Sequence, residues 1–145
     1  GSFTNKVKNY PLARKALALV DQNIKLIELK GYSREQVNLL LNSCNVALLT
    51  SFSEGSPNFI KEAMACNCPV VSTDVGDVKE ITSNIDGTYI CDFSPDDVAK
   101  KLSKALDFQN RTKGREQIKH LEIKLVAERL TSIYDMVIKR TSVIK

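Results

Sequence analysis

Two glutamates, Glu54 and Glu62, flank the point where a polar loop runs into a predicted helix. Glu54 lies in the loop 51–55, and Glu62 follows Pro57 by five residues. At about 1.5 Å of rise per residue, Glu62 would sit about 7 to 8 Å along the helix, with its side chain leaning back toward the N-terminus. Carboxylates accept pairs of hydrogen bonds from neighbouring hydroxyls, as on a sugar or a ribose. We therefore predict that both glutamates converge on one polar ligand in a single cleft.

The start of that helix is a predicted anion site. We expect Ser56 to be its N-cap and Pro57 its first residue, because serine caps free N–H groups and proline loses no hydrogen bond there. The first N–H groups of a helix lack partners, and the helix dipole leaves about half a positive charge beside them. Phosphate oxygens suit such an end, and Gly55 would let them approach the backbone. Neither a Walker nor a dinucleotide-binding fingerprint occurs in the chain.

The glutamates alone leave several functions open. A solvated loop glutamate and a carboxylate near a helix start both occur without any ligand. Against this, Glu62 has no cation three or four residues away with which to pair along the helix. A glycosidase would use the two carboxylates as acid and nucleophile, but a sugar ring would have to fit between them. A non-catalytic α/β interaction domain would leave both of them in solvent.

Residues 49–77, LTSFSEGSPNFIKEAMACNCPVVSTDVGD, resemble the donor-binding signature of the retaining group 1 glycosyltransferases. These enzymes have the GT-B fold, in which two Rossmann-like domains face each other across a cleft. The likeness extends over residues 5–139 and implies that residues 3–145 are most of the C-terminal, nucleotide-sugar-binding domain, with its first strand truncated. Gly1-Ser2 resembles the remnant of an expression tag.

The resemblance implies transfer of a hexose from a nucleoside diphosphate sugar to a glycan or other acceptor hydroxyl. Glu54 would be the catalytic residue, contacting the donor sugar beside the reacting centre, and Glu62 would hold the ribose hydroxyls. Lys8 would neutralise the diphosphate. The other donor-binding residues implied, at the base and along the sugar and diphosphate, are Gly31, Tyr32, Gly55, Ser56, Pro57 and Asn58. No metal or other cofactor is implied, and the chain contains no Asp-x-Asp motif.

Acceptor binding in this family belongs largely to the N-terminal domain. We therefore expect this domain alone to be inactive, since the two reactants could not be brought together. Its partners would be the nucleotide-sugar donor and the N-terminal domain of the same chain. Without that second domain, the segment is expected to bind the donor weakly and to transfer nothing.

The sequence departs from the family pattern at several positions. Ser56-Pro57 replaces the usual aromatic-glycine pair, and Gly76-Asp77 replaces a double glycine. The arginine that usually precedes the lysine is not evident. Lysines in a polar stretch are usually solvated, and a tyrosine such as Tyr32 often packs at a domain edge, so both assignments have ordinary alternatives. These departures leave the base and the sugar of the donor open.

The composition is that of an average soluble domain. The 145 residues carry a net charge of +4, and 43% are hydrophobic. Because there is no long run of like charge and no apolar stretch near the roughly 18 residues of a membrane span, neither nucleic acid nor a transmembrane segment is expected. The four cysteines lack zinc-like spacing and favour buried, reduced thiols. We expect a cytoplasmic location, with peripheral membrane association through the N-terminal domain.

Strand and helix patterns alternate along the chain and predict a Rossmann-like α/β fold, a three-layer sandwich with a parallel sheet that forms the C-terminal half of a GT-B fold. A capping box at Ser33 and Gln36 starts the second helix, and Asn67 is expected in the left-handed conformation at the end of the third. Residues 108–116 are expected to be a loop, and His120 a helix-end residue. Strands are predicted at 24–30, 46–50, 69–72 and 88–91, and helices at 11–20, 33–44, 56–67, 78–82, 94–106 and 118–137, the last with an apolar stripe for the core or an interface.

Overall fold

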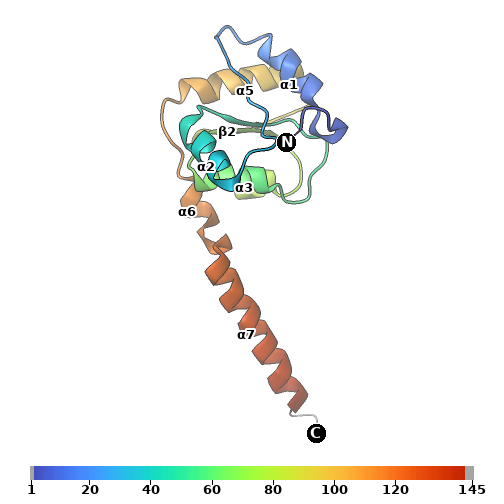
Figure 1. The fold of residues 1–145 in the computed structure, drawn as a ribbon, viewed down its shortest axis with the longest axis vertical. Helices are drawn as coiled ribbons and strands as arrows, with labels where there is room; N and C mark the ends of the chain where they lie inside the picture. Colours follow the sequence, from blue (N-terminus) through green and yellow to red (C-terminus); the bar gives the residue numbers. More distant parts are fainter. Residues whose placement is uncertain (1, 143–145) are drawn as a thin grey trace.

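A computed structural model describes residues 2–142 of the chain, and at its centre lies a parallel sheet (Figure 1). Its strands are β1 (Ala47–Leu49), β2 (Val70–Thr73) and β3 (Thr88–Cys91), in the spatial order β1-β2-β3. Both strand pairs are parallel, with Leu49 opposite Ser72 and Thr73 opposite Cys91. The predicted parallel sheet is confirmed, and the carboxyl ends of its strands share one edge.

Helices cover both faces of this sheet (Figure 1). One layer holds α1 (Tyr10–Leu17) and α5 (Pro95–Asp107), which pack on Val71 of β2. The other holds α2 (Arg34–Ser43), α3 (Asn58–Ala65) and α6 (Gly114–Ile118), and its apolar residues surround Val70. Neighbouring strand residues point to opposite faces, so Val70 and Val71 each serve one layer. The predicted Rossmann-like sandwich is confirmed. The short elements are η1 (Lys6–Lys8), α4 (Val78–Ile81) and η2 (Lys119–Leu121), and α7 (Ile123–Ser142) follows them.

Local sequence signals account for several element ends. The Gln36 N–H donates to Ser33 Oγ at 3.3 Å, and the Ser33 N–H donates to Gln36 Oε1 at 2.9 Å, which confirms the capping box. Asn67 has φ of +53° after α3, as predicted for a left-handed helix end. His120 lies in η2, just after α6. None of the described helices combines the length and apolar character that crossing a bilayer would require.

The prediction of a strand at residues 24–30 is wrong. This segment is irregular and lies outside the three-stranded sheet, although Ile24 packs on the core. Its apolar pattern reports burial, but a strand also needs a neighbour that completes its backbone hydrogen bonds, which the pattern does not reveal. Leu26, Ile27 and Leu29 instead form the wall of a cavity beside β1.

Two predicted helix boundaries also differ. Pro57 is the N-cap of α3 rather than its first residue, because the Ser56 hydroxyl donates to Asp77 instead of capping the helix. The long helix expected over 118–137 is broken at Glu122, whose ψ of 134° separates η2 from α7. The region 108–116 is not all loop, since α6 begins at Gly114.

The helix α7 projects away from the sandwich (Figure 1). Its apolar side chains include Ile123, Leu130 and Ile133, all exposed in this structure.

In the loop before α6, the Arg111 guanidinium donates to backbone carbonyls of Leu41, Cys44 and Cys66 at 2.7 to 2.9 Å. One side chain thus satisfies carbonyls at the ends of both α2 and α3, where helices have no partners of their own.

Candidate functional site

The loop after β1 is held in place by the N-terminal segment. Thr50 Oγ1 donates to the carbonyls of Lys8 and Asn9 at 3.0 and 3.2 Å. The Phe52 N–H donates to the Val7 carbonyl at 2.8 Å. Asn9 turns the chain with φ of +49°, a conformation that asparagine tolerates. These contacts bring two segments that are more than 40 residues apart in sequence together at the carboxyl edge of the sheet.

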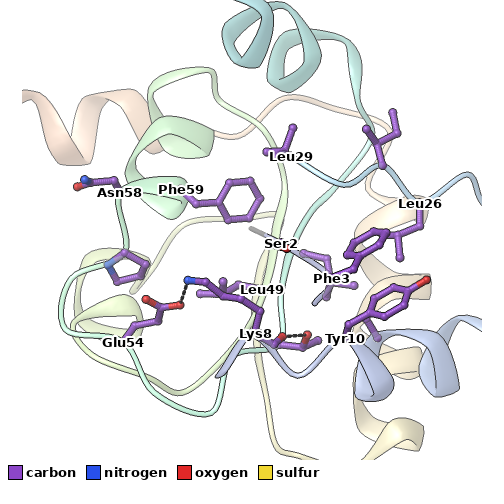
Figure 2. A pocket seen from close by; sticks show the side chains of 15 residues that line it. Ser2, Phe3, Lys8, Tyr10, Leu26, Leu29, Leu49, Glu54, Asn58 and Phe59 are labelled. Atoms are coloured by element: carbon purple, nitrogen blue, oxygen red, sulfur yellow. Dashed lines mark hydrogen bonds and ion pairs between the residues drawn. The ribbon is translucent and has the colours of Figure 1, made fainter. Parts of the chain in front are cut away.

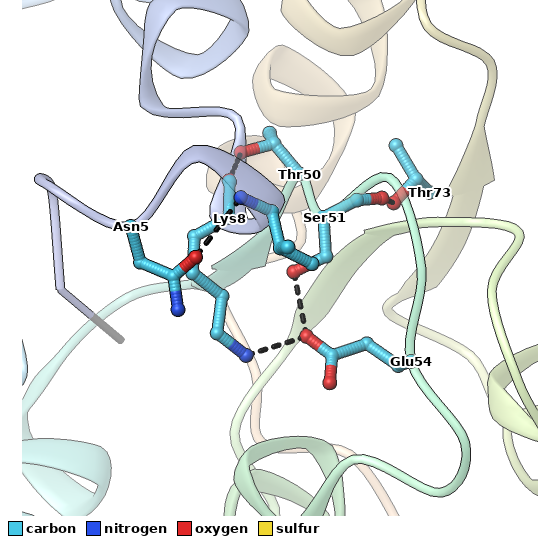
Figure 3. Close-up of polar contacts among 7 residues, drawn as sticks. Asn5, Lys8, Thr50, Ser51, Glu54 and Thr73 are labelled. Atoms are coloured by element: carbon cyan, nitrogen blue, oxygen red, sulfur yellow. Dashed lines mark hydrogen bonds and ion pairs between the residues drawn. The ribbon is translucent and has the colours of Figure 1, made fainter.

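Lys8 and Glu54 form an ion pair at this junction (Figure 3). Lys8 Nζ lies 2.6 Å from Glu54 Oε1, and Ser51 Oγ donates to the same oxygen at 2.7 Å. Burial by itself would raise the pKa of Glu54, but hydrogen bonds from Lys8 and Ser51 and the lysine charge outweigh it, and the pKa is lowered. The Glu54 side chain is only 16% exposed and is ionised at neutral pH.

A cavity of about 270 Å³ opens beside this ion pair (Figure 2). Lys8 and Glu54 line one side, and Pro57, Asn58 and Phe59 at the start of α3 line another. Apolar side chains of β1 and of the irregular segment 24–30 complete the wall. An apolar cavity with a few polar groups at the carboxyl edge of a parallel sheet is a typical ligand site of α/β folds.

The N-terminus of α3 faces this cavity without a side-chain cap. Its N-cap, Pro57, has neither an N–H nor a capping side chain, and no side chain among the described residues accepts a capping hydrogen bond there. The Ile60 N–H turns back to the Pro57 carbonyl at 3.1 Å. The N–H groups of Asn58 and Phe59 are therefore the ones that an anion could use.

A second loop, after β2, packs against the loop of Glu54 and supports it. Gly76 has φ of +57°, and a Cβ there would overlap the Gly55 carbonyl and lie 2.9 Å from the Glu54 carbonyl oxygen. The Asp77 N–H donates to the Gly55 carbonyl at 3.2 Å. The Ser56 hydroxyl hydrogen-bonds to both Asp77 and Lys61. Two departures from the family pattern, at Ser56 and Asp77, thus contact each other.

Ser51 and Gly76 are the residues of the site that sequence reasoning missed. The available signals were a serine, Ser51, three residues before a loop glutamate, and a glycine, Gly76, shortly after an apolar strand. Gly55, by contrast, has open space where a Cβ would be, so packing does not require a glycine there.

Glu62 lies against other cavities than Glu54. It lines a hollow of about 490 Å³ together with Tyr32, Arg34 and Asn38, at the start of α2. It also borders a groove toward α6. Asn58 lines both this groove and the Glu54 cavity. The expectation of a single cleft considered the rise along α3 but not its rotation: five residues turn a helix by about 500°, which leaves Glu62 about 140° around from Pro57.

Most other expected site residues lie in these two regions. Tyr32 is half exposed and faces the Glu62 hollow, and Gly31 makes the turn before it with φ of +80°. Ser56 is exposed at the loop, where its hydroxyl is directed to Asp77. Within the described residues, the Glu62 carboxylate has no hydrogen-bond or ion-pair partner.

The chain is also similar to known proteins. The family model described as glycosyl transferases group 1 matches residues 6–107, which include η1, the sheet and the loop of Glu54. The chain belongs to this family. The resemblance noted from residues 49–77 is thereby confirmed at the level of the family.

Two curated relatives match the chain as well. One is the N,N'-diacetylbacillosaminyl-diphospho-undecaprenol alpha-1,3-N-acetylgalactosaminyltransferase of Campylobacter jejuni, 28% identical over 114 residues, which cover 74% of this chain and 30% of that protein. The other is an uncharacterized glycosyltransferase of Methanocaldococcus jannaschii, 28% identical over 109 residues, which cover 74% of this chain and 29% of that protein. The chain therefore spans about 30% of the length of these relatives.

Proposed function

We propose that residues 3–145 are the donor-binding, C-terminal domain of a retaining GT-B glycosyltransferase. The reaction would move a hexose from a nucleoside diphosphate sugar to a glycan or other acceptor hydroxyl. The observation that carries this proposal is the Lys8–Glu54 ion pair, which lies beside a cavity at the uncapped start of α3. A cation, free N–H groups and an ionised carboxylate together suit a ligand that joins a diphosphate to a sugar.

Lys8 and the start of α3 would stabilise the leaving group. As the bond between the anomeric carbon and the diphosphate oxygen breaks, negative charge grows on that oxygen. Once the donor is bound, the Nζ of Lys8 and the N–H groups of Asn58 and Phe59 would all face the diphosphate, so they would stabilise this charge as it forms. Such help requires no metal ion. The backbone of Gly55, Ser56 and Pro57 would line the sugar and diphosphate.

Glu54 would orient the sugar and stabilise positive charge at the anomeric carbon. Its lowered pKa keeps it ionised, as this role requires. Donor binding would draw Lys8 from Glu54 toward the diphosphate, which leaves the carboxylate free to face the sugar. The acceptor oxygen then forms its bond to the anomeric carbon as the bond to the diphosphate breaks, and its proton passes to the departing diphosphate oxygen.

Glu62 and Tyr32 would bind the nucleoside. They line one hollow, in which the ribose hydroxyls could donate to Glu62 while the base lies against the tyrosine ring. Asn58 borders the Glu54 cavity and also the groove on the other flank of Glu62. A donor molecule would therefore extend around the start of α3, with its diphosphate near Asn58, rather than lie in one cleft.

The Campylobacter relative suggests which donors and acceptors to test. Its name describes transfer of N-acetylgalactosamine to a sugar on a lipid diphosphate. We propose that N-acetylhexosamine donors belong in the test set beside plain hexoses. We also propose that the whole protein works in the cytoplasm, with its N-terminal domain at the membrane surface. This domain alone would transfer no sugar.

A thermal-shift and calorimetry panel tests the proposal. The ligands are UDP, GDP and their hexose and N-acetylhexosamine derivatives, without added metal. Ligand at 100 times its dissociation constant adds about 2.7 kcal/mol to the free energy of unfolding, which raises the melting temperature by several degrees. We expect one nucleotide series to shift the wild type and to lose its effect in Glu62→Ala. If no nucleotide binds, the non-catalytic interaction domain becomes the better interpretation.

A further inference from the structure

Two thiols outside the proposed donor site lie in contact. Cys44 Sγ and Cys68 Sγ are 3.4 Å apart. Cys44 is the C-cap of α2 and is half-buried, whereas Cys68 is fully buried between α3 and β2. The two residues are separated by 24 positions in sequence, so the pair joins the end of α2 to the segment between α3 and β2.

The surroundings of the pair favour a thiolate on Cys44. The hydrogen bond with Cys68 lowers the pKa of Cys44 to about 7, outweighing burial, and the Arg111 charge contributes. The guanidinium is fixed there by its hydrogen bonds to the Cys44 and Cys66 carbonyls. The pKa of Cys68 is raised, first because its hydrogen bond with Cys44 favours the protonated form and also because it is buried. The other two cysteines also have raised pKa values, mainly through burial.

We propose that Cys44 and Cys68 form an oxidation site at which hydroperoxides produce an intramolecular disulfide. A half-buried thiolate beside a cation, with a second thiol in contact, is the arrangement of a reactive cysteine and its resolving partner. The disulfide would need the two sulfurs to approach from 3.4 Å to about 2.05 Å. Cys44 can make this movement because it lies at a helix end rather than within a strand.

The chemistry proceeds in two steps. The Cys44 thiolate attacks one oxygen of the hydroperoxide, an S–O bond forms, the O–O bond breaks, and the departing alkoxide takes up a proton to leave as an alcohol. The Cys68 sulfur then attacks the Cys44 sulfur, and the S–S bond forms as the S–O bond breaks. The proton of Cys68 leaves with the hydroxide as water. Overall, two thiols and one hydroperoxide give a disulfide, an alcohol and water.

The disulfide would fix the end of α2 to the region between α3 and β2. The hollow of Glu62 and Tyr32 lies between these helices, and Cys66, two residues before Cys68, is part of its lining. Oxidation would therefore stiffen the wall of the hollow to which we assign the nucleoside. The oxidation itself does not depend on that assignment.

Peptide mapping of peroxide-treated native protein tests the proposal. Trypsin cuts after Arg34, Lys61 and Lys79, so Cys44 lies in peptide 35–61, and Cys66 and Cys68 share peptide 62–79. We expect treatment with cumene hydroperoxide or hydrogen peroxide, followed by alkylation, to join these peptides within one chain. The link should persist in Cys66→Ser and Cys91→Ser and disappear in Cys44→Ser. A link that depends on Cys66, or one that forms only between chains on a non-reducing gel, would overturn the proposal.

A second variant guards against a result that reflects folding alone. In Cys68→Ser, the sulfenic acid on Cys44 has no resolving thiol and should be trapped by dimedone, which adds to peptide 35–61. Circular dichroism checks that this variant is folded. If folded Cys68→Ser gives no dimedone adduct on Cys44 and the wild type gives no linked peptides, the pair is a packing contact only.

Discussion

The two glutamates of the proposed donor site differ in burial and in their hydrogen-bond partners. Glu54 is nearly buried, is bonded to Lys8 and Ser51, and is supported by a second loop. Glu62 is exposed on the flank of α3, and its carboxylate has no described partner. The difference suggests that the reacting end of the donor meets a site built in advance, whereas the nucleoside end meets a charge that the ligand itself must satisfy.

Gly76→Ala should produce the largest effect, because it removes the support behind the Glu54 loop. An alanine Cβ would overlap the Gly55 carbonyl, and φ of +57° disfavours any side chain. We expect the free energy of unfolding to fall by about 2 to 3 kcal/mol, measured by urea denaturation. Gly55→Ala is the matched control, since its Cβ meets open space, and it should change stability by less than about 0.5 kcal/mol. If both variants lose the same free energy of unfolding, Gly76 does not support the Glu54 loop.

Lys8→Met should weaken binding of nucleoside diphosphates next most strongly. The variant removes the cation but keeps an apolar side chain of similar length. Hydrogen bonds to charged groups contribute about 1.5 to 3 kcal/mol, so affinity should fall by about 10-fold to 100-fold in calorimetry. Lys6→Met, in the same short helix but outside the lining of the Glu54 cavity, is the control. An affinity that Lys6→Met lowers just as much would mean that only overall charge matters.

Glu62→Gln should weaken binding by about 10-fold, because the neutral amide accepts less strongly from ribose hydroxyls. Stability should not change measurably, since the carboxylate has no described partner to lose. For deoxyribonucleotides, which lack the 2′-hydroxyl, the loss of affinity from wild type to variant should be smaller. If ribose and deoxyribose donors lose affinity equally, Glu62 does not contact that hydroxyl.

Glu54→Gln should change how stability depends on acid. The pKa of Glu54 is lowered in the folded state, so its ionised form adds stability above its unfolded pKa, and this is lost as the pH falls through the folded pKa. The wild type should therefore lose more stability than Glu54→Gln between about pH 5 and pH 2, measured by thermal melts. If the stability of Glu54→Gln falls with decreasing pH as steeply as that of the wild type, the result would contradict the ion pair.

Removal of α7, by ending the chain after Glu122, should have the smallest effect. Its principal packing partner is the neighbouring short helix η2, and the apolar residues Ile123, Leu130 and Ile133 are exposed. We expect the melting temperature to change by less than about 2 °C, measured by calorimetry, because little apolar surface would be uncovered. A large drop would show that the helix packs on the sandwich in solution.

The sheet and most helices could be predicted because each depends on signals close together in sequence. Buried runs gave β1, β2 and β3, and the capping box at Ser33 gave the start of α2. The segment 24–30 could not be predicted, because whether an apolar run becomes a strand depends on a partner elsewhere in the fold.

The site divides in the same way. The loop of Glu54 and its position at a strand end follow from local sequence. Its contact with Lys8 rests on hydrogen bonds between segments distant in sequence, and the support from Gly76 rests on a close backbone approach. Glu62 is separated from Glu54 because α3 rotates between Pro57 and Glu62. The residue spacing is enough to predict this rotation, but our expectation used only the rise per residue.

The short helix η1 has no buried residue, yet it carries Lys8 to the ion pair. The side chains of these three residues therefore add little to the packing of the sandwich, while the charge offered to a ligand depends on Lys8. Substitutions here could therefore change the charge offered to the proposed ligand without loss of the fold.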